Sequence, residues 1–227
     1  MTPTSSKILE EKIGYKFKNE ELLREALTHS SFANEQKIRK CRNYERLEFL
    51  GDAVLELASS KFFFLNHPDM LEGEMTKLRS STVCEQALAF CAKDLSLGEY
   101  IHLGKGEEAT GGRDRDSIIS DVMEALIGAI YLDSGFEEAE SFILKYVLSD
   151  LETKQLFYDS KTILQEKIQK RGQNIHYEII EESGPDHDKQ FTVEAYIDDK
   201  AVGRGVGRTK KSAEQQAAYA VLIEWEK

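Results

Sequence analysis

The sequence contains little of what disulfide scaffolds and β-rich folds require. Among its 227 residues are three cysteines, three prolines and one tryptophan. Cys41, Cys84 and Cys91 form no C-x-x-C pair and have no histidine beside them at zinc-ligand spacing, so we expect buried free thiols. Because prolines and glycines are few and long segments are rich in Leu, Ala, Glu and Lys, the composition favours helices and excludes an all-β sandwich.

Hydrophobic runs long enough to cross a membrane are missing as well. A helical span needs about 18 apolar residues, whereas the run Phe62–Leu65 is followed at once by Asn66 and His67. The segment Met1–Gly14 carries four charged residues and has no apolar core of a signal peptide. We therefore expect a cytoplasmic protein in a reducing compartment, with no membrane partner.

The chain is acidic, and its charge is unevenly distributed. It has 30 basic residues against 41 acidic ones, a net charge of −11. Residues 159–227 hold 11 basic and 13 acidic residues, a net −2, which leaves −9 for the first 158 residues. Nucleic-acid binding depends on local clusters of Lys and Arg, so the net charge alone does not exclude it.

Apolar spacing predicts helices through most of the first 149 residues and a mixed unit after them. The expected helices of the first part are 7–13, 19–27, 44–65, 74–93, 116–132 and 137–148. After a polar stretch, 149–160, we expect a helix at 161–170, strands at 176–180, 190–197 and 200–205, and a closing helix at 209–225. The order α-β-β-β-α makes a complete small domain.

Acidic residues recur at helical spacing within an otherwise apolar segment, residues 44–58. At about 100° per residue, one narrow arc of this helix carries Glu45, Glu48, Asp52 and Glu56. Apolar residues cover most of the other directions, so the pattern predicts a helix that is buried on nearly all sides.

A second helix repeats this pattern, with Asp121 and Glu124 one turn apart in an apolar segment that continues through Tyr131. Uncompensated ionised carboxylates in such places cost several kcal/mol each, so they must be paired, neutralised or bound to metal. Arg46 is the only basic residue within the first motif.

The simplest arrangement packs the two helices together, with Gly51 and Gly128 allowing a close approach. The acids that would then converge on a hard divalent cation are Glu48, Asp52, Asp121 and Glu124. Ligation by oxygen alone favours Mg²⁺ or Mn²⁺ over zinc. The alternative is a groove lined with solvated carboxylates or a set of ion pairs, and Glu56 is the first candidate for that role.

These motifs resemble the ribonuclease III family. Residues 43–55, NYERLEFLGDAVL, look like its signature motif, and residues 121–128, DVMEALIG, look like its second acidic motif. Tyr44 is a one-residue spacer that leaves the acidic spacing intact. The likeness continues through Leu27–Ser31, where we assign no chemistry to His29, and through Glu72–Met75 and Leu78–Ser80. The C-terminal part is similar to a double-stranded RNA-binding domain, so the resemblance covers nearly the whole chain in the bacterial order.

The resemblance implies an all-α endonuclease domain plus a small α+β (α-β-β-β-α) double-stranded RNA-binding domain. The implied boundaries are 1–150 for the catalytic domain, 151–158 for a linker and 159–227 for the binding domain. It also implies that Mg²⁺, with Mn²⁺ as its substitute, is bound by Glu48, Asp52, Asp121 and Glu124.

Among those acids, Asp52 and Glu124 match the positions most strongly tied to hydrolysis. Glu45 and Glu72 match further acidic positions, where we expect contacts with an RNA strand or a second metal. Taken alone, Phe49 would be an ordinary core residue. In the resembled family an aromatic residue at this position inserts into a socket on a second subunit, so the resemblance implies a homodimer.

The candidate RNA-binding residues lie in the C-terminal domain. One group belongs to residues 203–213, which lead from a strand into the last helix. This helix start offers free backbone N–H groups beside Arg208, Lys210 and Lys211, which suits a phosphate, although a merely solvated helix start is the alternative. The resemblance adds minor-groove contacts from Thr162, Gln165 and Glu166 on the first helix of this domain and from the loop 184–189, which contains His187.

The implied activity is hydrolysis of phosphodiester bonds in both strands of double-stranded RNA, leaving 5′-phosphate and 3′-hydroxyl ends. Its cellular role would be processing of ribosomal RNA precursors and of some messenger and transfer RNA transcripts. Two alternatives stay open: an RNA-binding protein with a degenerate nuclease domain, and an all-helical metal-dependent nucleotide hydrolase. The appended α-β-β-β-α domain argues against the second, because it has no use for a small-molecule substrate.

Overall fold

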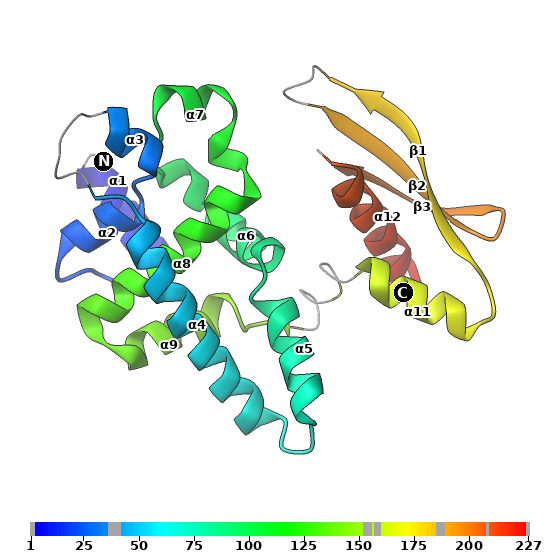
Figure 1. The fold of residues 1–227 in the computed structure, drawn as a ribbon, viewed down its shortest axis with the longest axis horizontal. Helices are drawn as coiled ribbons and strands as arrows, with labels where there is room; N and C mark the ends of the chain where they lie inside the picture. The colour runs from blue at the N-terminus through cyan, green and yellow to red at the C-terminus, as the bar shows by residue number, and fades with distance from the viewer. Residues whose placement is uncertain are drawn as a thin grey trace. The chain divides into compact units, whose positions relative to one another are not determined.

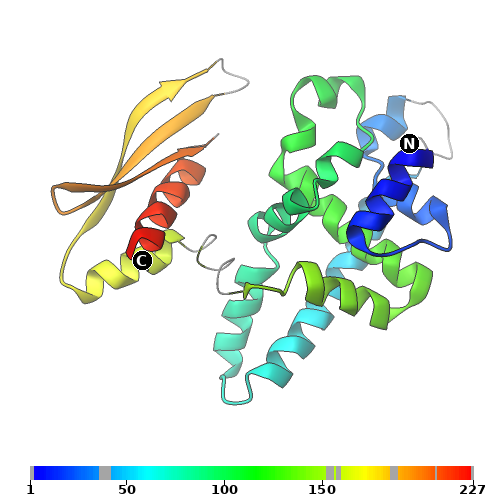
Figure 2. The same ribbon diagram turned by 180° about the vertical axis from the view of Figure 1, so that it is seen from behind.

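The computed structural model describes residues 3–35, 42–151, 156, 160–184, 189–207 and 209–225. These fall into two compact units, 1–149 and 150–227, which are described separately (Figures 1 and 2). Within the described residues, no helix is both long and apolar enough to cross a membrane.

The first unit is helical throughout. Its helices are α1 (Pro3–Ile13), α2 (Glu20–Ala26), α3 (Ser30–Glu35), α4 (Glu45–Asn66), α5 (Glu72–Thr82), α6 (Glu85–Asp94), α7 (Lys105–Ala109), α8 (Asp116–Ser134) and α9 (Phe136–Tyr146), with 3₁₀ turns at Leu97–Tyr100 and Gly112–Asp114. The short helices α3 and α7 were not expected, since neither is long enough to show an apolar period.

The single helix expected at 74–93 was wrong, because the structure divides it into α5 and α6. At the end of α5, the hydroxyls of Ser80, Ser81 and Thr82 each donate to a backbone carbonyl of the preceding turn. Such bonds compete with the helical backbone pattern. Cys84 then adopts an extended conformation and precedes α6.

The core of this unit surrounds α8. Nearly every residue from Ile118 to Ile130 is buried, and the exceptions are Asp121 and Glu124. Helices α2, α4, α6 and α9 all pack against α8 (Figure 1). Of the cysteines, Cys91 is buried and Cys84 half-buried, both as free thiols, and Cys41 lies outside the described residues.

Helices α4 and α8 touch through two glycines, as the sequence predicted. A Cβ atom on Gly51 would lie 1.8 Å from the carbonyl oxygen of Glu124, and one on Gly128 would lie 2.2 Å from the carbonyl oxygen of Leu47. Both distances are far below van der Waals contact. Any side chain at either position would therefore push the two helices apart.

The expectation that α4 is buried on nearly all sides was wrong. Phe49 is 80% exposed and Leu57 is 59% exposed, and Asp52 and Ala53 are exposed between them. Leu47, Val54, Leu55 and Ala58 form the buried side. The residues Phe49, Ala53 and Leu57, spaced four apart, therefore form an apolar strip that no described residue covers.

The second unit has the expected α-β-β-β-α order. Its elements are α11 (Ser160–Lys170), β1 (Ile175–Ser183), β2 (Gln190–Ile197), β3 (Lys200–Gly207) and α12 (Lys210–Trp225). The strands form an antiparallel sheet in the order β1-β2-β3, and both helices pack on one face of it (Figure 2). Strand β1 is longer than expected and contains an irregularity between Ile179 and Glu181.

The glycines of β3 allow the sheet to approach α12 closely. Cβ atoms on Gly205 and Gly207 would lie 2.2 Å and 2.6 Å from backbone nitrogens of α12, those of Ala217 and Ala213. Val193 and other apolar side chains of β2, α11 and α12 complete this core. The glycine-rich segment before α12 is thus required for packing, whatever the helix start binds.

Gly128→Ala should lower the free energy of unfolding by about 1–3 kcal/mol, the usual cost of inserting atoms into a tightly packed contact. The measurement is urea unfolding followed by far-UV circular dichroism. Gly106→Ala in α7 is the matched control, because a Cβ at that position meets nothing within 4 Å. Equal stabilities for the two variants would contradict the proposed role of Gly128.

Candidate active site

Four acids gather along the contact between α4 and α8. Glu48 and Asp52 belong to α4, and Asp121 and Glu124 belong to α8. Glu48, Asp121 and Glu124 are half-buried, whereas Asp52 is exposed. The acids therefore lie at the solvent edge of the helix contact, where a dissolved ion or an RNA strand can reach them.

The pKa of Glu124 is raised to about 8. Burial is the largest cause, and repulsion from Asp52, Glu48 and Asp121 follows. The carbonyl oxygen of Glu124 is also the atom that meets Gly51. The glycine contact thus draws the backbone of this acid against α4, which carries two of the acids that repel it.

Glu48 and Asp121 are perturbed in the same direction. Burial first, and then repulsion from Asp121, Glu45 and Asp52, raises the pKa of Glu48 to about 7. Burial also raises the pKa of Asp121, and a hydrogen bond from Tyr44 opposes that shift. Perturbed carboxylates that share one location are typical of functional sites.

None of the four acids forms a salt bridge with any residue that the structure describes. The neighbouring acid Glu56 differs, because its Oε2 lies 2.8 Å from Nε of Arg79. Glu56 is therefore an ion-pair member, the role that the alternative interpretation foresaw for it. The other four have no such ion-pair partner among the described residues, and the electrostatic effect of His29 acts to lower the pKa of Asp121.

In the described part of the chain, the side chains of His, Cys, Asp and Glu form no group of three or more that is arranged to hold a metal ion. The chemistry of the donors nevertheless fits a hard divalent cation. All four are carboxylates, and burial together with their mutual repulsion raises the pKa of Glu48 and of Glu124. A cation between them would relieve that repulsion.

Two residues that the sequence analysis left without a role lie beside the acids. Tyr44, interpreted there as a spacer, is buried, and its hydroxyl donates to Oδ2 of Asp121 at 3.2 Å. The rings of His29 and Tyr44 have centroids 5.6 Å apart. The sequence feature that could have identified Tyr44 is its position as a tyrosine directly before an acidic helix.

The remaining predicted residues of this unit are all exposed. Glu45 is the first residue of α4, and Glu72 is the first residue of α5, where it accepts a hydrogen bond from the Thr76 hydroxyl at 3.0 Å. Glu45 acts electrostatically on Glu48. Glu72 has no such effect on Glu48, Asp121 or Glu124, so the structure does not bring it into the same group.

In the second unit, the predicted RNA-binding residues lie on two helices. Thr162, Gln165 and Glu166 are exposed along one side of α11. Lys210 and Lys211 are exposed in the first turn of α12, where the Thr209 hydroxyl accepts the Ser212 N–H at 3.1 Å. His187 and Arg208 lie outside the described residues.

A salt bridge joins the two helices of this unit. Lys161 of α11 pairs with Glu214 of α12, and its Nζ lies 4.8 Å from the centroid of the Tyr177 ring. The outer side of α11 and the start of α12 are therefore held on one framework.

Comparison with known protein families divides the chain in the same way. Residues 19–151 match the family described as Ribonuclease-III-like, and residues 160–224 match the double-stranded RNA binding motif. The first match alone covers more than half of the chain.

Individual proteins that are similar to this chain belong to the same family. Ribonuclease 3 of Oceanobacillus iheyensis is 50% identical over 217 residues, which covers 94% of this chain and 95% of the relative. Ribonuclease 3 of Pelotomaculum thermopropionicum is 49% identical, covering 95% and 91%. The solved nuclease domain of ribonuclease III from Campylobacter jejuni is 42% identical with a TM-score of 0.58, and the match covers 65% of this chain and 95% of that one.

The raised pKa values predict how stability depends on pH. Protons bind Glu48 and Glu124 more tightly in the folded protein than in the unfolded chain. Their contribution to stability is therefore fully present below about pH 4.5 and is lost as the pH rises through 7 and 8. With a chelator present, the melting temperature should fall between pH 5 and 8.5 as these acids ionise.

Glu124→Gln should make the melting temperature fall less steeply with pH, because it removes the acid whose pKa is raised more than that of Glu48. Glu140→Gln in α9, which removes a carboxylate paired with Lys61, should leave the fall unchanged. The measurement is thermal unfolding by circular dichroism across the pH range. If the melting temperature falls with pH at the same slope in Glu124→Gln and in the unaltered protein, the raised pKa of Glu124 does not explain the fall.

Proposed function

The chain belongs to the ribonuclease III family and is an endoribonuclease for double-stranded RNA, and from this we propose that it hydrolyses both strands with divalent metal ions held by the acids between α4 and α8. The observation that carries the proposal is the set of four acids without salt bridges, placed on two helices that glycines bring into backbone contact. The products would carry 5′-phosphate and 3′-hydroxyl ends.

The residues that would hold the metal are Glu48, Asp52, Asp121 and Glu124. Mg²⁺ is the proposed ion, with Mn²⁺ as its substitute, because oxygen-only donors favour hard cations. When bound, such ions activate water and neutralise charge on the scissile phosphate and the leaving oxygen. The carboxylates themselves would orient the ions, and the half-buried setting of Glu48, Asp121 and Glu124 would limit competition from bulk water.

Asp52 and Glu124 are proposed as the acids tied most directly to hydrolysis. Asp52 is exposed, and burial raises the pKa of Glu124 to about 8, so the pair combines an accessible group with a strongly perturbed one. The exposed carboxylates of Glu45 and Glu72, at the first positions of α4 and α5, are proposed to contact an RNA strand or a second metal.

The second unit is proposed to recognise A-form RNA by its shape. Thr162, Gln165 and Glu166 would contact the 2′-hydroxyl groups of one minor groove. Lys210 and Lys211, at the positive end of α12, would contact phosphates across the major groove. Their exposure supports these roles. The same role is proposed for His187 and Arg208.

A homodimer is proposed to form through the apolar strip of α4. Phe49 and Leu57 are exposed in a helix whose opposite side is buried, and an apolar strip of this kind favours a partner surface. A structure of the nuclease domain of ribonuclease III from Campylobacter jejuni is described as having a region involved in dimer formation. A symmetric pair would present two equal sites, one for each RNA strand.

We further propose 1–150 as the catalytic domain, 151–158 as the linker and 159–227 as the binding domain. The two family matches, 19–151 and 160–224, support this division. The cellular role, supported by family membership, is cytoplasmic processing of ribosomal RNA precursors and of some messenger and transfer RNA transcripts.

Glu124→Gln should reduce cleavage of a labelled RNA duplex in Mg²⁺ by at least about 100-fold, since loss of a ligand costs no less than loss of its supporting residues. Binding of the same duplex should persist, because the second unit is unchanged. The assays are single-turnover cleavage and a gel-shift titration.

Two controls accompany this test. Glu56→Gln removes an acid from the next turn of α4 that is paired with Arg79, and it should still cleave. Lys211→Ala should weaken binding instead. If the unaltered protein binds the duplex and does not cut it, the protein is an RNA-binding module and the proposed metal site is wrong.

Phe49→Ser should weaken dimerisation by roughly 100-fold or more, because two copies of a buried phenylalanine are lost, each worth about 1.5–3 kcal/mol. Sedimentation equilibrium measures the effect. Ile8→Ser is the control, since Ile8 is also exposed but lies on α1. An unchanged dimer, or a monomeric unaltered protein, would contradict the proposed interface.

A further inference from the structure

Tyr44 connects the two acidic helices. Its backbone N–H donates to the carbonyl of Thr28 at 2.9 Å, and its own carbonyl accepts the N–H of Glu48 at 2.9 Å, so it begins the turn that carries Glu48. Its hydroxyl crosses to α8 and donates to Asp121. The side chain is only 4% exposed, which keeps water from replacing this bond.

The hydrogen bond from Tyr44 has no equivalent at the other acids. Among the described residues, it is the one side-chain hydrogen bond that any of Glu48, Asp52, Asp121 and Glu124 receives. A phenylalanine would fill the same space, so packing alone does not require the hydroxyl. The hydroxyl serves instead to bond the Asp121 carboxylate.

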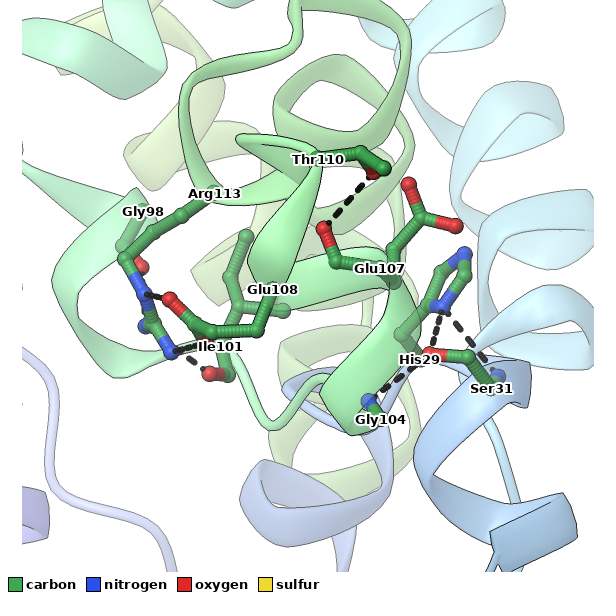
Figure 3. A network of polar contacts seen from close by, with 9 residues as sticks. All are labelled: His29, Ser31, Gly98, Ile101, Gly104, Glu107, Glu108, Thr110 and Arg113. Carbon is green, nitrogen blue, oxygen red and sulfur yellow. Dashed lines mark hydrogen bonds and ion pairs between the residues drawn. The ribbon is translucent and has the colours of Figure 1, made fainter.

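His29 supports the ring of Tyr44. Nδ1 of His29 accepts the Ser31 N–H at 3.1 Å and lies 2.7 Å from the Ser31 hydroxyl, which in turn accepts the Gly104 N–H at 2.8 Å (Figure 3). Because Nδ1 accepts the Ser31 N–H, the neutral ring carries its proton on Nε2. His29 is thus fixed in position and tautomer beside Tyr44.

The backbone around His29 is held equally firmly. The His29 N–H donates to the carbonyl of His102 at 3.1 Å, and the His102 N–H donates to the carbonyl of Leu27 at 2.8 Å. The segment before His102 is braced as well, because Arg113 donates to the carbonyls of Gly98 and Ile101 (Figure 3). The backbone that carries His29 is therefore held by hydrogen bonds to His102, which lies far from it in the sequence.

We propose that Tyr44 is a positioning residue for Asp121 and that His29 acts through Tyr44. The inference rests on the proposed function, in which Asp121 holds a metal ion. Groups that hydrogen-bond to a metal ligand orient it and tune its affinity, and their loss typically costs about 10–100-fold in metal binding or activity.

The test is Tyr44→Phe, with Mn²⁺ binding measured by electron paramagnetic resonance on the full chain without RNA. We expect the affinity for Mn²⁺ to fall by about tenfold or more. Cleavage should require correspondingly more Mg²⁺ and should recover when Mg²⁺ is in excess. A merely structural loss would not be repaired by added metal.

Tyr15→Phe is the matched control. The Tyr15 hydroxyl donates to Oδ2 of Asp133 at 2.6 Å, so this variant also removes a tyrosine–aspartate hydrogen bond at α8, near the C-terminal end of that helix. It should leave Mn²⁺ affinity unchanged. Equal Mn²⁺ affinity in Tyr44→Phe and the unaltered protein would overturn the positioning role, whereas no Mn²⁺ binding by the unaltered protein would instead overturn the proposed function.

The role of His29 is tested by a double-mutant cycle. His29→Ala should weaken Mn²⁺ binding, and adding it to Tyr44→Phe should cause less than the full further loss, because both changes act on one hydrogen bond while His29 also acts electrostatically on Asp121. Fully additive losses would show that His29 does not act through Tyr44.

Discussion

The backbone contact between α4 and α8 is the constraint on which the site depends. Two helices approach this closely only where neither carries a side chain at the contact, and Gly51 and Gly128 meet that requirement from opposite sides. The same contact draws Glu124 against the helix that carries Glu48 and Asp52. Packing and the acidic character of the site are therefore one feature: the apolar burial of α8 holds together carboxylates that would otherwise separate.

This arrangement concentrates negative charge that no salt bridge of a described residue balances at Glu48, Asp52, Asp121 or Glu124. The raised pKa values of Glu48 and Glu124 express the cost of burying these acids beside one another. The divalent cation proposed for this site would relieve the repulsion among these acids. Tyr44 is the exception to the repulsion, since it offers one of the acids a hydrogen bond instead of another charge.

The two units divide the chemical tasks, and glycines act similarly in both. In the second unit, glycines of β3 let the sheet lie against the backbone of α12, as Gly51 and Gly128 do for the first. The result is a packed framework on which the residues of α11 and α12 proposed to contact RNA are exposed. Shape recognition of a duplex needs such fixed spacing more than it needs a basic net charge.

The sequence by itself determined the helical character of the first unit, the α-β-β-β-α order of the second, the close approach of two helices at Gly51 and Gly128, and the family. It could do so because apolar period, glycine position and acidic spacing are local properties of the chain. Only the tertiary structure decided the break between α5 and α6, the exposure of Phe49, the pairing of Glu56 with Arg79 and the hydrogen bond from Tyr44 to Asp121. Each of these features depends on contacts between surfaces of different elements. Residues far apart in the chain form those contacts only when the chain folds.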